Sequence, residues 1–217
     1  MIFSLLASSP ALAIAFLVAI LLSLTVHEFS HGLVAYWRGD RTAEYAGRLT
    51  LNPLSHIDPI GFIALLFLGF GWAKPVPYNP YNLRDAKWDS VRVALAGPIS
   101  NFFLAGVCAL LLRALVASGA PVGESLLPTF LLLMIVINLG LAYFNLIPIH
   151  PLDGSKLALA LLDAPRHARI REFILRQGSN LLIFLILLSF LPGLDVFGFL
   201  SRLVRGTCAL LVGGTCL

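Results

Sequence analysis

Two histidines and a glutamate lie within one helical turn in the stretch SLTVHEFSHGLVAYW, residues 23–37. His27, Glu28 and His31 form the pattern H-E-x-x-H. Because residues four apart on a helix share one face, the two imidazoles could bind a single zinc ion. Glu28 projects from nearly the same face and could take a proton from a zinc-bound water without being a ligand. The chemistry that this pattern suits is hydrolysis.

The alternative interpretation of this stretch is a pair of buried histidines satisfied by hydrogen bonds. The stretch follows ALAIAFLVAILL, one of the most apolar runs in the chain. An ionised carboxylate at membrane depth costs several kcal/mol unless it is paired or serves a function. The position of Glu28 therefore favours a metal site, which needs a third ligand.

The third ligand is predicted in FNLIPIHPLDGSKL, residues 144–157. Pro148 and Pro151 remove backbone donors and break a helix there. Unwound backbone at membrane depth persists only where it is buried in protein or lines a wet cavity. The carboxylate of Asp153 could thus approach a metal held by another helix. Taken alone, the Asp-Gly pair is explained equally well by an ordinary turn or helix cap.

The composition indicates what kind of element positions these residues. Of the 217 residues, 59% are hydrophobic and 12% are charged, and the mean hydropathy is +0.91. Soluble domains carry about 25% charged residues. The chain is therefore predicted to be a polytopic all-α bundle in a lipid bilayer, with no surface for nucleic acid. Its three cysteines form no CxxC pair and suggest no disulfide framework.

The apolar segments recur from end to end, which predicts one domain over 1–217. The core is expected over about 10–160, and 161–217 is expected to form a basic loop followed by C-terminal hydrophobic segments. The first segment lacks the features of a cleaved signal and is expected to be a retained span. The predicted segments are Pro10–Tyr36, 57–77, Val91–Ser118, Leu126–Ile147 and Leu181–Leu191.

Loop charge predicts the orientation of the bundle. Twelve of the fifteen basic residues fall between the first and third long spans or between the fourth and fifth. The positive-inside rule places both regions in the cytoplasm. Both ends of 57–77 then lie on one side, and this segment is short for a span of about 20 residues. A re-entrant or interfacial segment is expected there; the alternative is a full span, which places three basic residues outside.

Three separated motifs in this chain resemble those of the site-2 protease family of intramembrane zinc metalloproteases. They are HEFSH at 27–31, AGPISN at 96–101 and NLIPIHPLDG at 145–154. The resemblance covers residues 20–160 and is closest to a compact bacterial-type branch without PDZ or CBS domains. It implies a multi-pass protein of a bacterial or archaeal cell membrane, with its active site toward the cytoplasm.

The resemblance also implies roles for individual residues. His27, His31 and Asp153 would bind Zn²⁺, and Glu28 would be the general base. Asn101 and Asn145 are candidates for contact with the oxyanion or the substrate backbone, although a helix-packing role suits either equally well. His150 occupies a position that is usually apolar or proline in the family, and it is not expected to be a ligand.

The segment GRLTLNP, residues 47–53, alternates apolar and polar residues as a half-buried strand does. Leu49, Thr50 and Leu51 are predicted to form a strand that takes up an unwound substrate by β-addition. The alternative is a plain loop packed over the helix end.

The expected function is hydrolysis of peptide bonds in transmembrane or membrane-adjacent segments of membrane-protein or peptide substrates. The sequence gives no indication of oligomeric state. The alternative function is a transporter or metal-binding membrane protein that uses the same ligands without proteolysis. A transporter would show paired broken helices or inverted repeats. Only one clear break is present, at 145–153. A catalytically inactive scaffold would be expected to lack Glu28 or a ligand, and all four residues are present.

Overall fold

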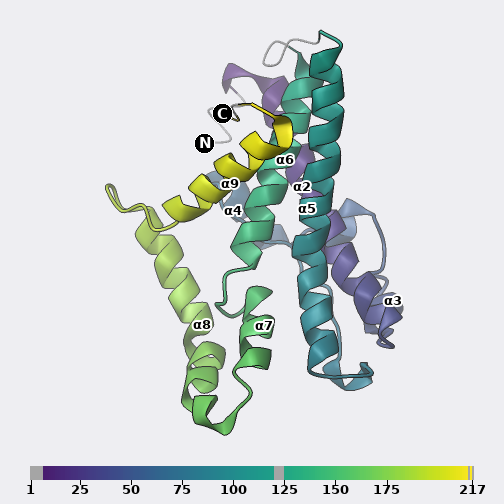
Figure 1. Cartoon of the computed structure of the whole chain (residues 1–217), viewed down its shortest axis with the longest axis vertical. Helices are drawn as coiled ribbons and strands as arrows, with labels where there is room; N and C mark the ends of the chain where they lie inside the picture. Colours follow the sequence, from purple (N-terminus) through teal and green to yellow (C-terminus); the bar gives the residue numbers. More distant parts are fainter. Residues whose placement is uncertain (1–6, 120–124, 215, 217) are drawn as a thin grey trace.

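The computed structural model describes residues 7–119, 125–214 and 216, and its regular structure is helical (Figure 1). Within these residues no strand is present, and an isolated antiparallel bridge joins Ile57 and Ala73. The predicted all-α class is confirmed. The elements are α2 (Pro10–Trp37), α3 (Thr42–Tyr45), η1 (Pro53–His56), α4 (Pro59–Leu68), η2 (Pro80–Asn82), α5 (Trp88–Ala117), α6 (Leu126–Asn145), α7 (Gly154–Leu161), η3 (Pro165–His167), α8 (Ala168–Ser189) and α9 (Gly198–Val212).

Four stretches in the described part of the chain are long and apolar enough to cross a membrane. They are α2, α5, α6 and the stretch Pro165–Ser189, which contains α8. Helices satisfy their own backbone hydrogen bonds, which is the requirement that a bilayer imposes on a spanning segment. The chain is an integral membrane protein.

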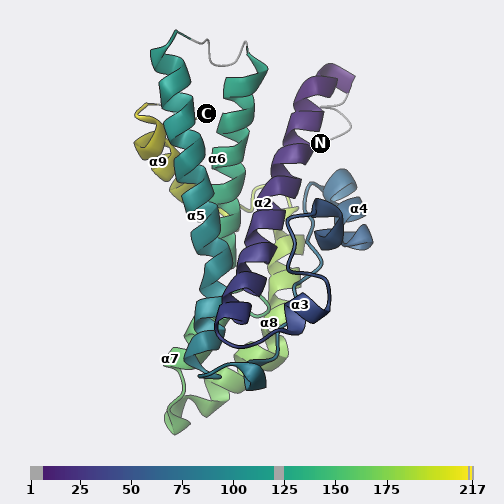
Figure 2. The same cartoon turned by 90° about the vertical axis from the view of Figure 1, so that its right-hand side faces the viewer.

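The centre of the bundle is formed by α2, α5 and α6, with α5 and α6 antiparallel (Figure 2). Small residues at the contact let the helices approach closely, as in other membrane bundles. Ala19 of α2 and Ala105 of α5 are fully buried, and they pack with Ile135 and Leu139 of α6. This tight centre is the frame on which the polar residues of α2 are held.

The chain that leads into the short helix α4 lies beside the chain that leaves it. Its ten residues extend for about 15 Å, half of the roughly 30 Å hydrocarbon core. The two ends are joined by the Ile57–Ala73 bridge and by a hydrogen bond from the Lys74 N–H to the His56 carbonyl, 2.9 Å. A Cβ on Gly71 would lie 2.3 Å from the Gly61 carbonyl oxygen, so the return chain packs directly on α4. The segment thus has the hairpin shape that the prediction of a re-entrant or interfacial segment requires, in place of one long helix.

The segment predicted as a strand does not form one. Leu49 and Thr50 lie in a bend, and Leu51 has no regular structure. Local side-chain hydrogen bonds replace the ladder, since the Asn52 N–H donates to Thr50 Oγ1 at 3.2 Å. His56 Nε2 donates a hydrogen bond to the Thr50 carbonyl at 2.8 Å, so this carbonyl is bonded to a side chain and not to a neighbouring strand.

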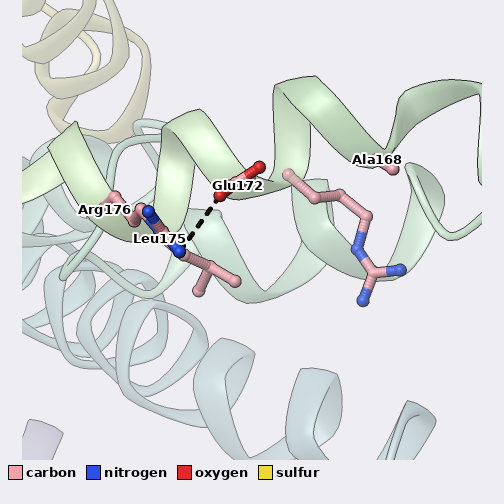
Figure 3. A pocket seen from close by; sticks show the side chains of 5 residues that line it. Ala168, Glu172, Leu175 and Arg176 are labelled. Carbon is pink, nitrogen blue, oxygen red and sulfur yellow. Dashed lines mark ion pairs between the residues drawn. The ribbon is translucent and has the colours of Figure 1, made fainter.

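The predicted basic loop after residue 161 is also wrong in its conformation. After Asp163 the chain forms η3 and then α8, which begins at Ala168 and carries the basic residues on its first turns. Figure 3 shows this part of α8, where Arg176 pairs with Glu172 at 3.2 Å beside a shallow pocket. Helical i,i+4 pairs of this kind stabilise an exposed helix start.

The cysteines differ from expectation as well. Cys208 in α9 forms a disulfide with Cys216, while Cys108 in α5 is free and buried. Gly213 ends α9 with φ of +77°, and this left-handed residue turns the tail back toward the helix. Cys216 is thereby brought beside Cys208.

Candidate metal centre

His27, Glu28 and His31 lie in the C-terminal half of α2. His27 lies about 15 Å along the helix axis from Trp37, the last helical residue. Its side chain is buried, and Glu28 and His31 are half-buried. The two imidazole rings meet edge to face, with centroids 4.6 Å apart and planes at 87°. Their Nε2 atoms consequently face the same space beside the helix.

Asp153 completes a three-residue cluster in that space. The chain unwinds after α6, and Asp153 immediately precedes α7. Asp153 Oδ2 lies 3.2 Å from His27 Nε2 and 3.4 Å from His31 Nε2. Burial would raise the pKa of the Asp153 carboxyl, but the two imidazoles lower it to about 2, so it is ionised at neutral pH.

The cluster has the dimensions of a zinc site. Zinc–nitrogen and zinc–oxygen bonds of about 2.0 Å in a tetrahedron place neighbouring ligand atoms about 3.3 Å apart. The two measured separations from Asp153 to the imidazoles, 3.2 and 3.4 Å, match that spacing. Asp153 Oδ2 is also buried without a hydrogen-bond partner, as expected for an atom whose partner is a metal. His27, His31 and Asp153 therefore fit zinc by both donor type and geometry.

The Nδ1 atoms of both histidines contact residues of α5. His27 Nδ1 lies 2.6 Å from Asn101 Oδ1, and His31 Nδ1 lies 2.7 Å from the backbone carbonyl of Val93. A carbonyl oxygen can only accept, so His31 carries its proton on Nδ1. Its Nε2 lone pair is then free for a metal, as in most zinc sites.

Gly97 of α5 makes room for both rings. A Cβ at this position would lie 2.5 Å from His27 Cε1 and 2.5 Å from His31 Nε2. The next residue, Pro98, lies inside the helix and is buried. The Gly-Pro pair of the AGPISN stretch thus brings the backbone of α5 against the two imidazoles, which explains why this motif accompanies H-E-x-x-H.

We predict that Gly97→Ala weakens zinc binding by about 10-fold, on the scale of a disturbed outer contact. The added methyl group must push one imidazole away from its place in the cluster. Gly106→Ala on the same helix is the matched control, because nothing lies within 4 Å of its Cβ position. Zinc titration against a chelator in detergent measures both variants. Equal affinities for the two would contradict the proposed contact.

Glu28 is held by the chain that returns from α4. The Val76 N–H donates to Glu28 Oε2 at 2.9 Å. Pro75 and Pro77 flank Val76 and have no N–H, so Val76 supplies the one backbone donor of this three-residue stretch. One carboxylate oxygen of Glu28 is therefore fixed beside the metal ligands.

The buried carboxylate of Asp40 anchors the next part of the returning chain. It accepts hydrogen bonds from the Asn79 N–H at 2.6 Å and from Asn82 Nδ2 at 2.9 Å. Burial would raise the pKa of the Asp40 carboxyl, but hydrogen bonds from Thr42, Asn82 and Asn79 lower it below its ordinary value. Asp40 stays charged and ties the returning chain to the end of α2.

A cavity of about 960 Å³ opens in front of the cluster. Its wall is mostly apolar and is contributed by α2, α4, α6, α8 and the returning chain. This volume is at the upper end of the roughly 300–1,000 Å³ of ligand pockets. Glu28 and the three predicted ligands lie in the wall, so the cluster faces a space that a large apolar molecule could enter.

Of the remaining predicted site residues, one lines the cavity and the others do not. Asn145 lines the cavity, and its Nδ2 donates to the Leu141 carbonyl. Asn101 is fully buried behind His27, where its amide contacts protein groups, and it is not among the residues that line the cavity. His150 lies against Gly178 of α8 and outside the cluster, as expected. Leu49, Thr50 and Leu51 are not among the lining residues.

The sequence reasoning missed two buried polar residues near the site. Asn138 of α6 and Ser23 of α2 are fully buried and connect to Asn101. One available signal was the position of Asn138 inside the apolar run LLLMIVINLG, where a polar side chain needs a partner.

The fold and the site together define a class, the multi-pass membrane metalloproteases with an H-E-x-x-H helix. The sequence model of Peptidase family M50 matches residues 15–127 and 115–188. The chain belongs to this family, the site-2 protease family, and is a zinc metalloprotease of that type. The resemblance seen in the three motifs is confirmed.

Individual relatives agree with this assignment. The chain is 38% identical over 173 residues to a Bacillus subtilis protein named "Putative zinc metalloprotease YwhC", covering 78% of each chain. It is 37% identical over 139 residues to the Mycolicibacterium smegmatis protein named "Putative zinc metalloprotease Rip2", covering 62% of this chain and 52% of the relative. It is also 36% identical over 77 residues to "Membrane metalloprotease ARASP, chloroplastic" of Arabidopsis thaliana, covering 33% and 17%. No solved structure matches the chain.

Proposed function

We propose that this protein is an intramembrane zinc metalloendopeptidase that hydrolyses peptide bonds in transmembrane or membrane-adjacent segments of its substrates. The observation that carries this proposal is the placement of His27, His31, Asp153 and Glu28 in the wall of an apolar cavity. His27 lies about 15 Å along the axis of α2 from its last residue, which supports a site within the bilayer.

His27, His31 and Asp153 would hold the zinc ion and leave one position open. Bound there, zinc supplies a water of lowered pKa and polarises the carbonyl of the scissile bond. Glu28 accepts the proton of the attacking water and then transfers it to the leaving amine. The Val76 N–H keeps one oxygen of this carboxylate in place, so the base needs no reorganisation before it acts.

The cavity supports a substrate that enters from the bilayer. A transmembrane helix hides its peptide bonds in its own hydrogen bonds, so a stretch of it must unwind before cleavage. The freed backbone groups then need polar partners inside an apolar space. Asn145 lines the cavity and is the side chain that we propose for this contact. Asn101 is fully buried and does not line the cavity, so we do not propose it for this contact.

The test of the proposed function is zinc analysis of the purified protein together with cleavage of candidate membrane peptides. About one zinc per chain and chelator-sensitive cleavage within an apolar segment are the expected results. Stoichiometric zinc without cleavage of any membrane peptide would favour a protein that uses the ligands without proteolysis. Absence of zinc would contradict the site.

We also propose that the active site lies toward the cytoplasm of a bacterial or archaeal cell membrane. Most of the basic residues lie in or directly beside α3, α7 and the starts of α5 and α8, and these elements lie toward one end of the bundle (Figure 1). Such residues favour the cytoplasmic face. The disulfide of α9 lies toward the other end, which suits the oxidising side of the membrane.

Orientation is tested by labelling a cysteine introduced at Lys87, which lies just before α5 and whose side chain is 39% exposed. A membrane-impermeant maleimide should label Lys87→Cys in inverted vesicles and not in intact cells, because the reagent cannot reach the cytoplasm. A cysteine in place of Ser118, at the far end of α5, is the matched control and should show the opposite pattern. Labelling of Lys87→Cys in intact cells would reverse the proposed orientation.

A further inference from the structure

Arg48 is a buried arginine that forms no ion pair with a carboxylate in the described part of the chain. It is only 8% exposed, and its Nη2 donates to the backbone carbonyl of Lys74 at 2.6 Å. Its Nε is buried without a hydrogen-bond partner among the described residues. Burying a charged group is costly unless the group is paired. Packing alone therefore does not explain why a guanidinium occupies this position.

The turn that ends α3 places Arg48. The Arg48 N–H donates to the Ala43 carbonyl at 2.8 Å, and the Gly47 N–H donates to the Glu44 carbonyl at 2.9 Å. These two bonds form a Schellman motif, in which the residue after the C-cap is left-handed. Gly47 has φ of +64°, which glycine adopts without the steric cost of a Cβ. The backbone of Arg48 is thus fixed to α3.

Two more hydrogen bonds connect Lys74 with the loop that contains Arg48. The Lys74 N–H donates to the His56 carbonyl at 2.9 Å, and His56 Nε2 donates to the Thr50 carbonyl at 2.8 Å. Together with the contact between Arg48 and Lys74, these bonds form a closed ring that joins the loop to the chain on both sides of α4. The segment predicted as a substrate strand is therefore bonded to the protein itself.

Lys74 lies two residues before Val76, whose N–H donates to Glu28 Oε2 at 2.9 Å. Pro75 lies between them, and Pro77 follows Val76. A proline fixes its own φ and restricts the conformation of the residue before it. This stretch is consequently stiff, and the position of the Lys74 carbonyl determines where the Val76 N–H lies.

Val76 lies between two anchored positions of the chain that returns from α4. On its C-terminal side, the Asn79 N–H donates to the buried carboxylate of Asp40 at 2.6 Å. On its N-terminal side, the Lys74 carbonyl accepts from Arg48. A buried anion thus fixes one end and a buried cation fixes the other, so both are needed to define the place of the Val76 N–H.

We propose that Arg48 is a positioning residue that keeps the Val76 N–H against Glu28 and thereby orients the general base. Arg48 acts through the Lys74 carbonyl and is not among the residues that line the cavity. The inference rests on the proposed role of Glu28. It gives residues 47–53 a function other than the predicted strand, since their arginine holds the segment that holds the base.

The test is Arg48→Met, which retains a long side chain and removes every donor. Zinc content should stay unchanged, because Arg48 contacts none of the proposed ligands. The kcat for a membrane peptide should fall by about 10–100-fold, since a misplacement of about 1 Å can cost 10²-fold. KM should change by less than about 2-fold, as expected for an interaction that matters in the transition state alone. A disturbed cavity would raise KM instead.

Three further variants complete the series. Arg48→Lys keeps the charge and one long donor and should recover most of the lost kcat. Arg41→Met is the matched control, because the side chain of Arg41 is 58% exposed and pairs only with Glu44; its kcat should be unchanged. Arg48→Gln is polar but too short to replace the contact with Lys74. It should show the same fall in kcat and serves where Arg48→Met does not fold.

Amide hydrogen exchange over residues 73–79 measures the contact without cleavage or zinc. Exchange should be about 10-fold faster in Arg48→Met, the scale of one lost hydrogen bond, and unaltered in Arg41→Met. If the unchanged protein cleaved no membrane peptide, the proposed function would fail while this measurement still decided the contact. Unaltered exchange in Arg48→Met would overturn the inference. So would an unaltered kcat, a rise in KM that accounts for the loss, or no recovery in Arg48→Lys.

Discussion

Glu28→Gln should retain zinc while cleavage of a membrane peptide falls by at least about 100-fold, the scale of a lost general base. The amide has the shape of the carboxylate but cannot take a proton from a water. Its oxygen can still accept the hydrogen bond from the Val76 N–H, so the local structure should persist. Zinc content by elemental analysis and peptide cleavage in detergent or liposomes are the two measurements.

The matched control for this variant is Glu44→Gln. Glu44 is an exposed residue of α3 with a long contact of 3.9 Å to Arg41, and exposed pairs contribute little. It should cleave at the unchanged rate. Substantial turnover by Glu28→Gln would remove Glu28 from the mechanism, and a loss of zinc in that variant would make it a ligand.

Asp153→Ala should lose zinc during purification, whereas His150→Ala should keep it. Asp153 is one of the three proposed ligands, so its loss should exceed the roughly 10–100-fold cost of an outer partner. His150 lies three residues earlier on the same unwound segment but packs against Gly178 and away from the cluster. The two variants thus disturb the same stretch of chain with opposite expected results.

The measurement is zinc retention after dialysis, with helix content by circular dichroism as the check on folding. Equal loss of zinc in Asp153→Ala and His150→Ala would indicate that the unwound segment as a whole, and no single carboxylate, supports the metal. Retention in both would place the third ligand elsewhere.

The sequence predicted the long helices closely because the bilayer leaves few alternatives. The first segment was predicted to start at Pro10 and does so, and the fourth was predicted from Leu126 and also begins there. Apolar runs of this length have to be helical, and proline or glycine marks their ends. The two proposed ligands of α2, His27 and His31, could also be found from the sequence, since their spacing is local.

Other features could not be predicted because they depend on contacts between distant segments. Asp153 was supported by the family motif, and its 3.2 Å approach to His27 depends on how α2 and α6 pack. The period-two pattern around Thr50 predicted a strand, but side chains of that stretch bond to their own backbone. The basic stretch was predicted from charge alone, while Ile170, Phe173 and Ile174 at helical spacing indicate the helix that forms.

The ten-residue length of α4 has implications for the lipid around the protein. A helix of about 15 Å can fill only one leaflet, so acyl chains of the other leaflet must bend into the space beyond its tip. Ile63 and Phe67 are exposed on α4 and would contact these lipids. We therefore expect a locally thinned, disordered bilayer beside the cavity. A substrate helix that diffuses there would lose part of its hydrophobic match, which would lower the cost of unwinding it beside the proposed zinc ligands.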